Sequence, residues 1–304
     1  LVFFLVLLVV PVWSPPVIAD SPPPALEVFV SVPPQAYFVE QIGGKLVSVN
    51  IFLQPGQSPH TYEPTPKQML TLGRSALYFT VGIPFEQRLL KKIQDSHQAL
   101  TVVDTAAGIK RRKIGSLDPH HGEEDSGHKR DGAEDPHIWL SPEMIKIQVR
   151  RIAGALQSVD PENAESFRKN LVSFLAELET VDRKIKQLLA PYRGESFYVF
   201  HPAFGYFGDA YGLEQKAVEV EGKRPSIRNL RTIIKNARAE NVKIIFVQPQ
   251  FDDRSAQAIA RTVGGVVVPM DPLARAVLKN LEDMAVELER DLKDRNGEVS
   301  DEQP

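Results

Sequence analysis

Short runs of β-branched and aromatic residues alternate with helix-forming stretches along almost the whole chain, and this alternation limits the possible folds more than any other feature. The β-rich runs lie at residues 27–32, 45–52, 76–81, 99–104, 196–200, 216–220, 242–248 and 264–269. The helical patterns between them include residues 33–44, 84–94, 225–240, 252–263 and 272–293. Strands that alternate with helices of about 10–15 residues form βαβ units and mainly parallel sheets. The sequence therefore predicts an α/β protein.

One long segment departs from this alternation. From residue 161 to 190 the chain has no glycine and no proline after Pro161, and its apolar residues recur at spacings typical of an amphipathic helix. These residues are Ala164, Phe167, Leu171, Phe174, Leu178, Val181, Ile185 and Leu188. Such a helix is about 45 Å long, and Asp160 is a good N-cap for it. An ordinary core helix is one interpretation. The position between two sets of βα units favours a rigid α-helix that joins two lobes.

The length of 304 residues corresponds to about two domains. We expect an N-terminal βα lobe at residues 20–159, the linking helix at 160–192, a C-terminal βα lobe at 193–296 and a polar tail at 297–304. The net charge of -3 gives no basic surface for a nucleic acid. We therefore expect no nucleic-acid partner, and we expect a monomer.

The N-terminus carries the pattern of a secretory signal. LVFFLVLLVVPVW (residues 1–13) is apolar but shorter than the about 20 residues that a spanning helix needs. Val17 and Ala19 then supply the small residues of a signal-peptidase site. We expect a signal peptide at residues 1–19, cleavage near Ala19, and a mature protein in the periplasm. An uncleaved membrane anchor is the alternative.

Four of the seven histidines lie in one polar segment, LDPHHGEEDSGHKRDGAEDPH (residues 117–137). It also holds seven acidic residues, so it cannot form a core and is expected to be a surface loop. A solvated charged loop is the simplest interpretation, although tracts rich in histidine and acid are typical of metal handling. The chain has no cysteine, which excludes disulfides and thiolate metal sites.

Three other positions place a histidine beside a proline at the boundary of a predicted element. They are His60 in QSPHTYEP, His137 in EDPHIWLSP and His201, which directly follows the strand-like FYVF. Asp271, in VVPMDPL, also leaves a predicted strand before a proline. In open α/β sheets, ligands bind beyond the carboxyl ends of the strands. We therefore expect these four side chains to converge, two from each lobe, on a cleft.

Imidazole and carboxylate ligands without thiolates suit tetrahedral Zn²⁺, whereas Mn²⁺ favours more oxygen ligands. Each of the three histidines alone is well explained as a capping or core residue. The same placement four times favours a shared metal site. His97, in the polar stretch KIQDSHQAL, is expected at the surface.

The chain carries, in this order, the motifs SVPPQAYFVEQIGG, PGQSPHTYEPTP, DPHIWLSP, HPAFGYF, QPQFDDRSAQAIA and DPL. From about Leu26 to Leu292 these closely resemble the metal-binding solute receptors of bacterial ABC importers, and most of all the periplasmic zinc-binding subunits of high-affinity zinc uptake systems. The resemblance implies two βα lobes, a linking helix and a metal site in the cleft between the lobes.

The resemblance also assigns ligands. The three histidine ligands of the family fall on His60, His137 and His201, and the aspartate that completes many sites falls on Asp271. Manganese-type relatives carry an acidic residue where His201 stands, so the motif HPAFGYF indicates zinc. Pro59 stands where some zinc receptors have a glutamate, which leaves Asp271 or water as the fourth ligand.

Two further expectations follow from the resemblance. The loop histidines, His120, His121 and His128, match a His-rich loop found in zinc members and are candidates for a weak second site. Four aromatic residues near His201 in the sequence are expected to form an apolar wall that shields it; they are Phe200, Phe204, Tyr206 and Phe207.

The sequence thus predicts a receptor that captures Zn²⁺ and delivers it to the membrane permease of an ABC transporter, and not an enzyme. A zinc-dependent hydrolase with a three-histidine site is an alternative, but the chain has no H-E-x-x-H motif. A manganese or iron receptor of the same family is another alternative. An extracellular adhesin is a third, but no exposed repeat or adhesive motif supports it.

Overall fold

The computed structural model describes residues 25–59, 61–93, 100–114, 133–219, 227–251 and 254–297. The predicted signal peptide, His60, His97 and the loop histidines at 120, 121 and 128 lie outside these residues. None of the helices in the described ranges is long and apolar enough to span a bilayer.

The N-terminal lobe is built on a sheet of four parallel strands in the order β2-β1-β3-β4. These are β1 (Leu26–Val30), β2 (Val47–Ile51), β3 (Leu77–Thr80) and β4 (Thr101–Asp104). In register, Val28 of β1 lies between Val49 of β2 and Leu77 of β3. All four residues of β3 are buried, as expected for a parallel strand covered on both faces.

The C-terminal lobe repeats this strand order. Its sheet runs β6-β5-β7-β8, again with every pair parallel. The strands are β5 (Ser196–Val199), β6 (Glu214–Ala217), β7 (Ile244–Val247) and β8 (Val266–Pro269). In both lobes the strand order reverses between the first and third strands of the lobe, which is where an open α/β sheet forms its ligand crevice.

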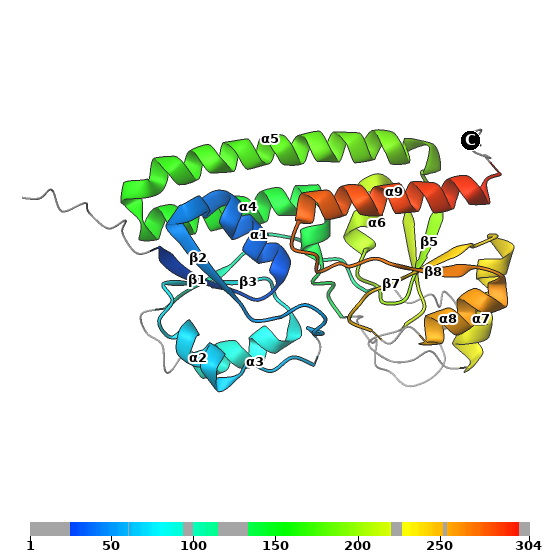
Figure 1. Cartoon of the computed structure of the whole chain (residues 1–304), viewed down its shortest axis with the longest axis horizontal. Coiled ribbons are helices and arrows are strands. Elements are labelled where there is room, and N and C mark those ends of the chain that lie inside the picture. Colours follow the sequence, from blue (N-terminus) through cyan, green and yellow to red (C-terminus); the bar gives the residue numbers. More distant parts are fainter. Residues whose placement is uncertain are drawn as a thin grey trace, which may run out of the picture.

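Helices cover both faces of each sheet (Figure 1). In the N-terminal lobe these are α1 (Pro33–Gly43) and α4 (Pro142–Val159) on one face, with α2 (Pro66–Leu72) and α3 (Pro84–Ile93) on the other. In the C-terminal lobe they are α6 (Gly205–Tyr211) and α9 (Val277–Arg295), opposite α7 (Ile227–Ala239) and α8 (Arg254–Val263). The short 3₁₀ turn η2 (Ile138–Leu140) precedes α4.

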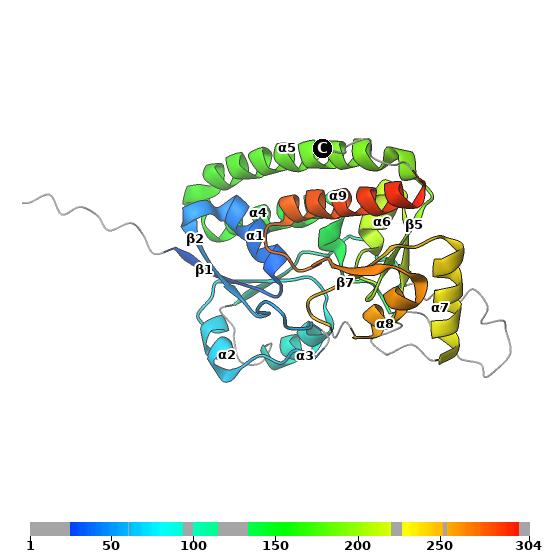
Figure 2. The same ribbon diagram turned by 45° about the vertical axis from the view of Figure 1, so that its right-hand side comes forward.

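The long helix α5 (Ala164–Leu189) spans the two lobes and confirms the predicted linking helix. Figure 2 shows it running above α1 and α4 at one end and above α9 at the other, and residue contacts join it to all three. The Asp160 side chain accepts a hydrogen bond from the Asn163 amide in the 3₁₀ turn that leads into α5. The helix buries one stripe of residues, among them Phe167, Phe174 and Leu178, because every third or fourth residue faces the lobes beneath.

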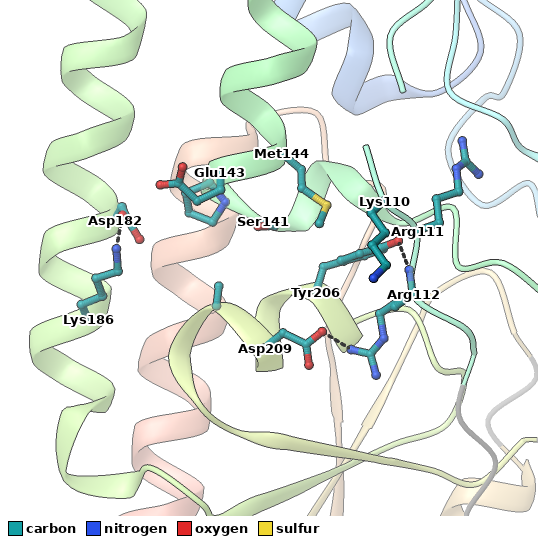
Figure 3. Close-up of a pocket in the computed structure, with 12 residues that line it drawn as sticks. Lys110, Arg111, Arg112, Ser141, Glu143, Met144, Asp182, Lys186, Tyr206 and Asp209 are labelled. Carbon is teal, nitrogen blue, oxygen red and sulfur yellow. Dashed lines mark hydrogen bonds and ion pairs between the residues drawn. The ribbon is translucent and has the colours of Figure 1, made fainter. Parts of the chain in front are cut away.

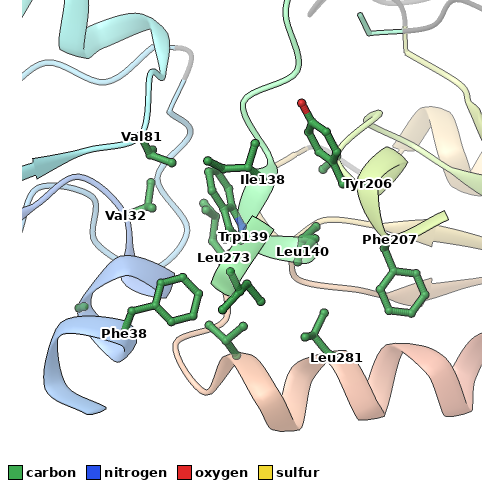
Figure 4. Close-up of a cluster of buried hydrophobic side chains, with 14 of the residues drawn as sticks. Val32, Phe38, Val81, Ile138, Trp139, Leu140, Tyr206, Phe207, Leu273 and Leu281 are labelled. Atoms are coloured by element: carbon green, nitrogen blue, oxygen red, sulfur yellow. The ribbon is translucent and has the colours of Figure 1, made fainter. Parts of the chain in front are cut away.

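Apolar side chains continue across the boundary between the lobes (Figure 4). Val32 and Val81 of the N-terminal lobe belong to the same buried cluster as Trp139, Leu273 and Leu281. In addition, the Trp139 indole Nε1 donates to the Pro272 carbonyl oxygen at 2.7 Å. The two lobes therefore meet at a packed seam next to the predicted ligands.

Several element boundaries differ from the predictions by two residues or more. β6, for example, begins two residues before the predicted run. α9 begins at Val277 rather than near residue 272, because the Asp271 carboxylate accepts from the Leu273 amide in a local turn that delays the helix.

Candidate metal centre

His201 lies at the carboxyl end of β5, at the point where the strand order reverses. Its main chain is held on both sides by Gln248, which follows the neighbouring strand β7. The His201 amide donates to Gln248 Oε1 at 3.0 Å, and Gln248 Nε2 donates to the His201 carbonyl at 2.9 Å. Because this pair of hydrogen bonds fixes the backbone, the side chain leaves the sheet in one defined direction, with only 3% of the residue exposed.

The His201 imidazole is oriented by Glu219, which follows β6. Its Nδ1 lies 3.1 Å from Glu219 Oε2, and a carboxylate only accepts, so Nδ1 carries the hydrogen. This tautomer places the lone pair on Nε2, the arrangement found in metal-binding histidines. Burial lowers the pKa of His201, although the hydrogen bond to Glu219 opposes that shift. The neutral form that binds metals is therefore favoured.

His137 is prepared in the same way by Asp135. Its Nδ1 lies 2.7 Å from Asp135 Oδ1, and its backbone amide donates to the same oxygen at 3.0 Å. Only 4% of His137 is exposed. Its ring also meets Trp139 edge-on, with the ring centroids 5.4 Å apart. Each histidine therefore has a buried carboxylate behind Nδ1.

The structure brings His137 and His201 together. Their ring centroids are 5.5 Å apart and their planes are inclined by 75°. His137 precedes α4, which packs on the N-terminal lobe, whereas His201 belongs to the C-terminal lobe. Two imidazoles at this separation can share one Zn²⁺, for which nitrogen ligands lie at about 2.0–2.1 Å.

Asp271 follows β8 and lies along the same seam, since its neighbour Pro272 accepts the indole hydrogen bond from Trp139. Its Oδ1 accepts from Gln250 Nε2 at 2.7 Å and from the Leu273 amide at 2.9 Å. Among the described residues, which exclude His60, no three histidine or acidic side chains surround one ion position. Of the four predicted ligands, the described chain therefore pairs only His137 and His201.

Several residues around these histidines were not predicted. Phe251, rather than the four predicted aromatic residues, stacks on His201, with ring centroids 4.6 Å apart. Phe200 contacts Phe251, with ring centroids 5.9 Å apart, and Phe204, Tyr206 and Phe207 lie in the main core. Asp135 could have been identified from its place two residues before His137. Glu219 could not, because only the pairing of β5 with β6 brings it to His201.

Two parallel α/β lobes joined by one long helix, with paired imidazoles at the seam, define a class: metal-binding receptors of the two-lobed, helix-linked type. Comparison with known proteins agrees. The family model described as "Zinc-uptake complex component A periplasmic" (ZnuA) matches residues 28–287. The chain therefore belongs to the ZnuA family of periplasmic zinc-uptake components.

Individual relatives support this membership. The chain is 28% identical over 256 residues to the high-affinity zinc uptake system protein ZnuA of Bacillus subtilis, covering 81% of this chain and 78% of that protein. A crystal structure of ZnuA superposes with a TM-score of 0.81 at 36% identity, covering 88% of this chain and all of that one. A zinc-bound ZnuA deletion mutant gives a TM-score of 0.80 at 37% identity, covering 88% and 98% of the two chains.

Proposed function

We propose that this protein captures Zn²⁺ at the seam between its lobes and delivers it to the membrane permease of an ABC importer. The observation that carries the proposal is the pairing of His137 and His201 across the seam, each with a buried carboxylate on Nδ1. His60 is the third proposed ligand, and Asp271 or water is the fourth. Family membership supports zinc as the cargo.

The proposed ligand set also decides between metals. Imidazole nitrogens favour zinc over manganese, which prefers oxygen ligands. A ligand set of three histidines is therefore a poor match for a manganese receptor, and family membership favours zinc over iron. Because each imidazole must be neutral to bind, zinc affinity falls as the solution is acidified.

The test is a zinc titration of metal-free protein, residues 20–304, against a chromophoric chelator. We expect one tight site, lost in His137→Ala and in His201→Ala. His97→Ala is a matched control that removes a histidine outside the proposed ligand set and leaves the site intact. Weak wild-type binding that neither His137→Ala nor His201→Ala changes would refute the proposal.

The same assay identifies the fourth ligand. Asp271→Ala weakens the tight site if the carboxylate binds the ion and leaves it unchanged if water does. To bind, Asp271 has to exchange its hydrogen bond from Gln250 for the metal. Gln250→Ala therefore serves as a partner variant that removes this competition, and it strengthens binding only if Asp271 is a ligand.

A hydrolase is the candidate from another class, since three histidines with an open position can activate water. We propose that the protein is not an enzyme, as expected for a solute-binding component of a transporter. Assay of the zinc-loaded protein on ester and peptide substrates tests this. Turnover that His201→Ala abolishes would establish the hydrolase instead.

The remaining parts of the proposal concern the chain as a whole. We propose cleavage near Ala19, lobe boundaries at residues 159–160 and 192–193, and a monomer. N-terminal sequencing of the exported protein and its mass in solution test the first and last of these. His120, His121 and His128 are proposed as a weak second site, so deletion of residues 118–134 removes any weak binding and leaves the tight site.

A further inference from the structure

Behind the His137 side chain, a hydrogen-bonded network crosses from the N-terminal side of the seam to helix α6 of the C-terminal lobe. It begins at Asp135, whose carboxylate holds His137 at one oxygen. The other oxygen, Oδ2, lies 3.8 Å from Nε of Arg112, and the Asp135 side chain is 1% exposed. Asp135 is therefore a buried link between a proposed zinc ligand and Arg112.

Tyr206 of α6 closes this network from the other lobe. Its hydroxyl donates to the Asp135 carbonyl oxygen at 3.0 Å and accepts from the Arg112 amide at 3.0 Å. The Asp135 amide in turn donates to the Arg112 carbonyl at 2.9 Å. The Tyr206 hydroxyl therefore links the backbones of both Arg112 and Asp135 to the C-terminal lobe.

The residues around Tyr206 accommodate its contact with Arg112. Figure 3 shows Arg112 between Tyr206 and Asp209, and its Nη1 lies 3.0 Å from the Asp209 carboxylate. Gly205 makes room for the guanidinium, since a Cβ at this position would lie 2.3 Å from Arg112 Nη1. A cavity of about 390 Å³ opens beside Arg112 and Tyr206, between α4, α5 and α6. The network is therefore buried at Asp135 and reaches solvent at Arg112.

We propose that Tyr206 is a positioning residue for the zinc ligand His137, acting through Asp135. The backbone of Asp135 is fixed by the C-terminal lobe through the phenol, and the carboxylate of Asp135 fixes the imidazole. His137 therefore keeps its direction towards His201 only while α6 stays in place. This inference rests on the proposed zinc site.

The first test compares zinc dissociation from wild type and Tyr206→Phe by stopped-flow mixing with excess chelator. We expect dissociation to be faster by roughly five-fold, which is what one lost hydrogen bond supports. Tyr211→Phe is the matched control, because Tyr211 lies on the same helix and, within the described part of the chain, its buried hydroxyl has no hydrogen-bond partner. Its dissociation rate stays at the wild-type value.

A second measurement separates positioning from general stability. In ¹⁵N NMR of the metal-free protein, the Nδ1 hydrogen of His137 exchanges faster with solvent in Tyr206→Phe, whereas that of His201 is unchanged. Gly205→Ala is a further variant that displaces Arg112 without touching the phenol. It should reproduce part of the effect on zinc dissociation.

A double-variant cycle tests the route through Asp135. If Tyr206 acts only through the Asp135 carboxylate, Tyr206→Phe adds nothing to the rate of Asp135→Ala, which has no side-chain acceptor for His137. Fully additive effects, or an unchanged dissociation rate and unchanged His137 exchange in Tyr206→Phe alone, would overturn the inference. Absence of tight zinc binding in the wild type would instead refute the proposed function.

Discussion

Glu219 offers a sharp test of how the centre works, because its role differs between metal-free and zinc-bound protein. Its side chain is 4% exposed and its Oε2 accepts from His201. Within the described part of the chain, its Oε1 has no hydrogen-bond partner. A buried carboxylate with so little compensation is costly, and a zinc ion on His201 would supply the missing positive charge. Glu219→Gln should therefore weaken zinc binding without destabilising the metal-free protein.

The magnitude follows from the contact that is lost. Removing the outer carboxylate of a metal-bound histidine lowers metal affinity by roughly 10- to 100-fold, or about 1.4–2.7 kcal/mol. Saturating zinc stabilises the folded state through its binding free energy. The rise in Tm that zinc causes therefore shrinks by about 3–11 °C in the variant, at about 2–4 °C per kcal/mol.

The assay is thermal unfolding of wild type and Glu219→Gln, each with chelator and with excess zinc. Glu214→Gln is the matched control, since Glu214 is an exposed carboxylate on β6. The reasoning is wrong if the variant loses Tm mainly in chelator, because Glu219 would then stabilise the fold rather than the ion. An unchanged zinc-induced rise in Tm would also refute it.

Three other variants test the fold around the centre. Burial raises the pKa of Glu86 to about 7, so its contribution to stability is greatest at low pH and is lost as the pH rises through 7. Against Glu86→Gln, wild-type unfolding free energy should fall by about 3 kcal/mol between pH 4.5 and 7 in urea titrations; a constant difference would contradict this. Phe174→Ala on α5 should cost about 3–5 kcal/mol, whereas exposed Val172→Ala should cost less than about 0.5 kcal/mol. Equal urea midpoints for these two variants would mean that α5 is not packed as described. Trp139→Phe removes the hydrogen bond to Pro272 and should cost about 1–2 kcal/mol in the same assay; an unchanged midpoint would show that this contact adds nothing.

Much of the architecture could be predicted because it depends on patterns that are local in sequence. α5 was predicted to within a few residues, since its apolar stripe repeats through many turns and Asp160 marks its start. The strands were predictable because parallel strands buried on both faces read as continuous apolar runs. α6 has only seven residues, too few for a clear period, so the sequence does not predict it.

The site was predictable only in part, for a related reason. His137 and His201 stand out as polar residues at the ends of apolar elements. Because ligands bind beyond the carboxyl ends of the strands in open α/β sheets, the sequence predicts that these two side chains converge. Their partners depend on tertiary register instead. Glu219 reaches His201 because β6 pairs with β5, and Phe251 covers His201 from the loop after β7. No periodic pattern in the sequence predicts either contact.

The contacts of α5 with helices of both lobes have a consequence for how tightly the cargo is held. In the proposed site each lobe supplies part of the coordination sphere, and α5 acts as a stiff linker between these two half-sites. A linker of matching span keeps the second half-site at high effective concentration. An ion that detaches from one imidazole is therefore recaptured before it diffuses away. If the proposed site holds, spontaneous loss is slower than the weak affinity of a single imidazole suggests, and release requires the two half-sites to move apart.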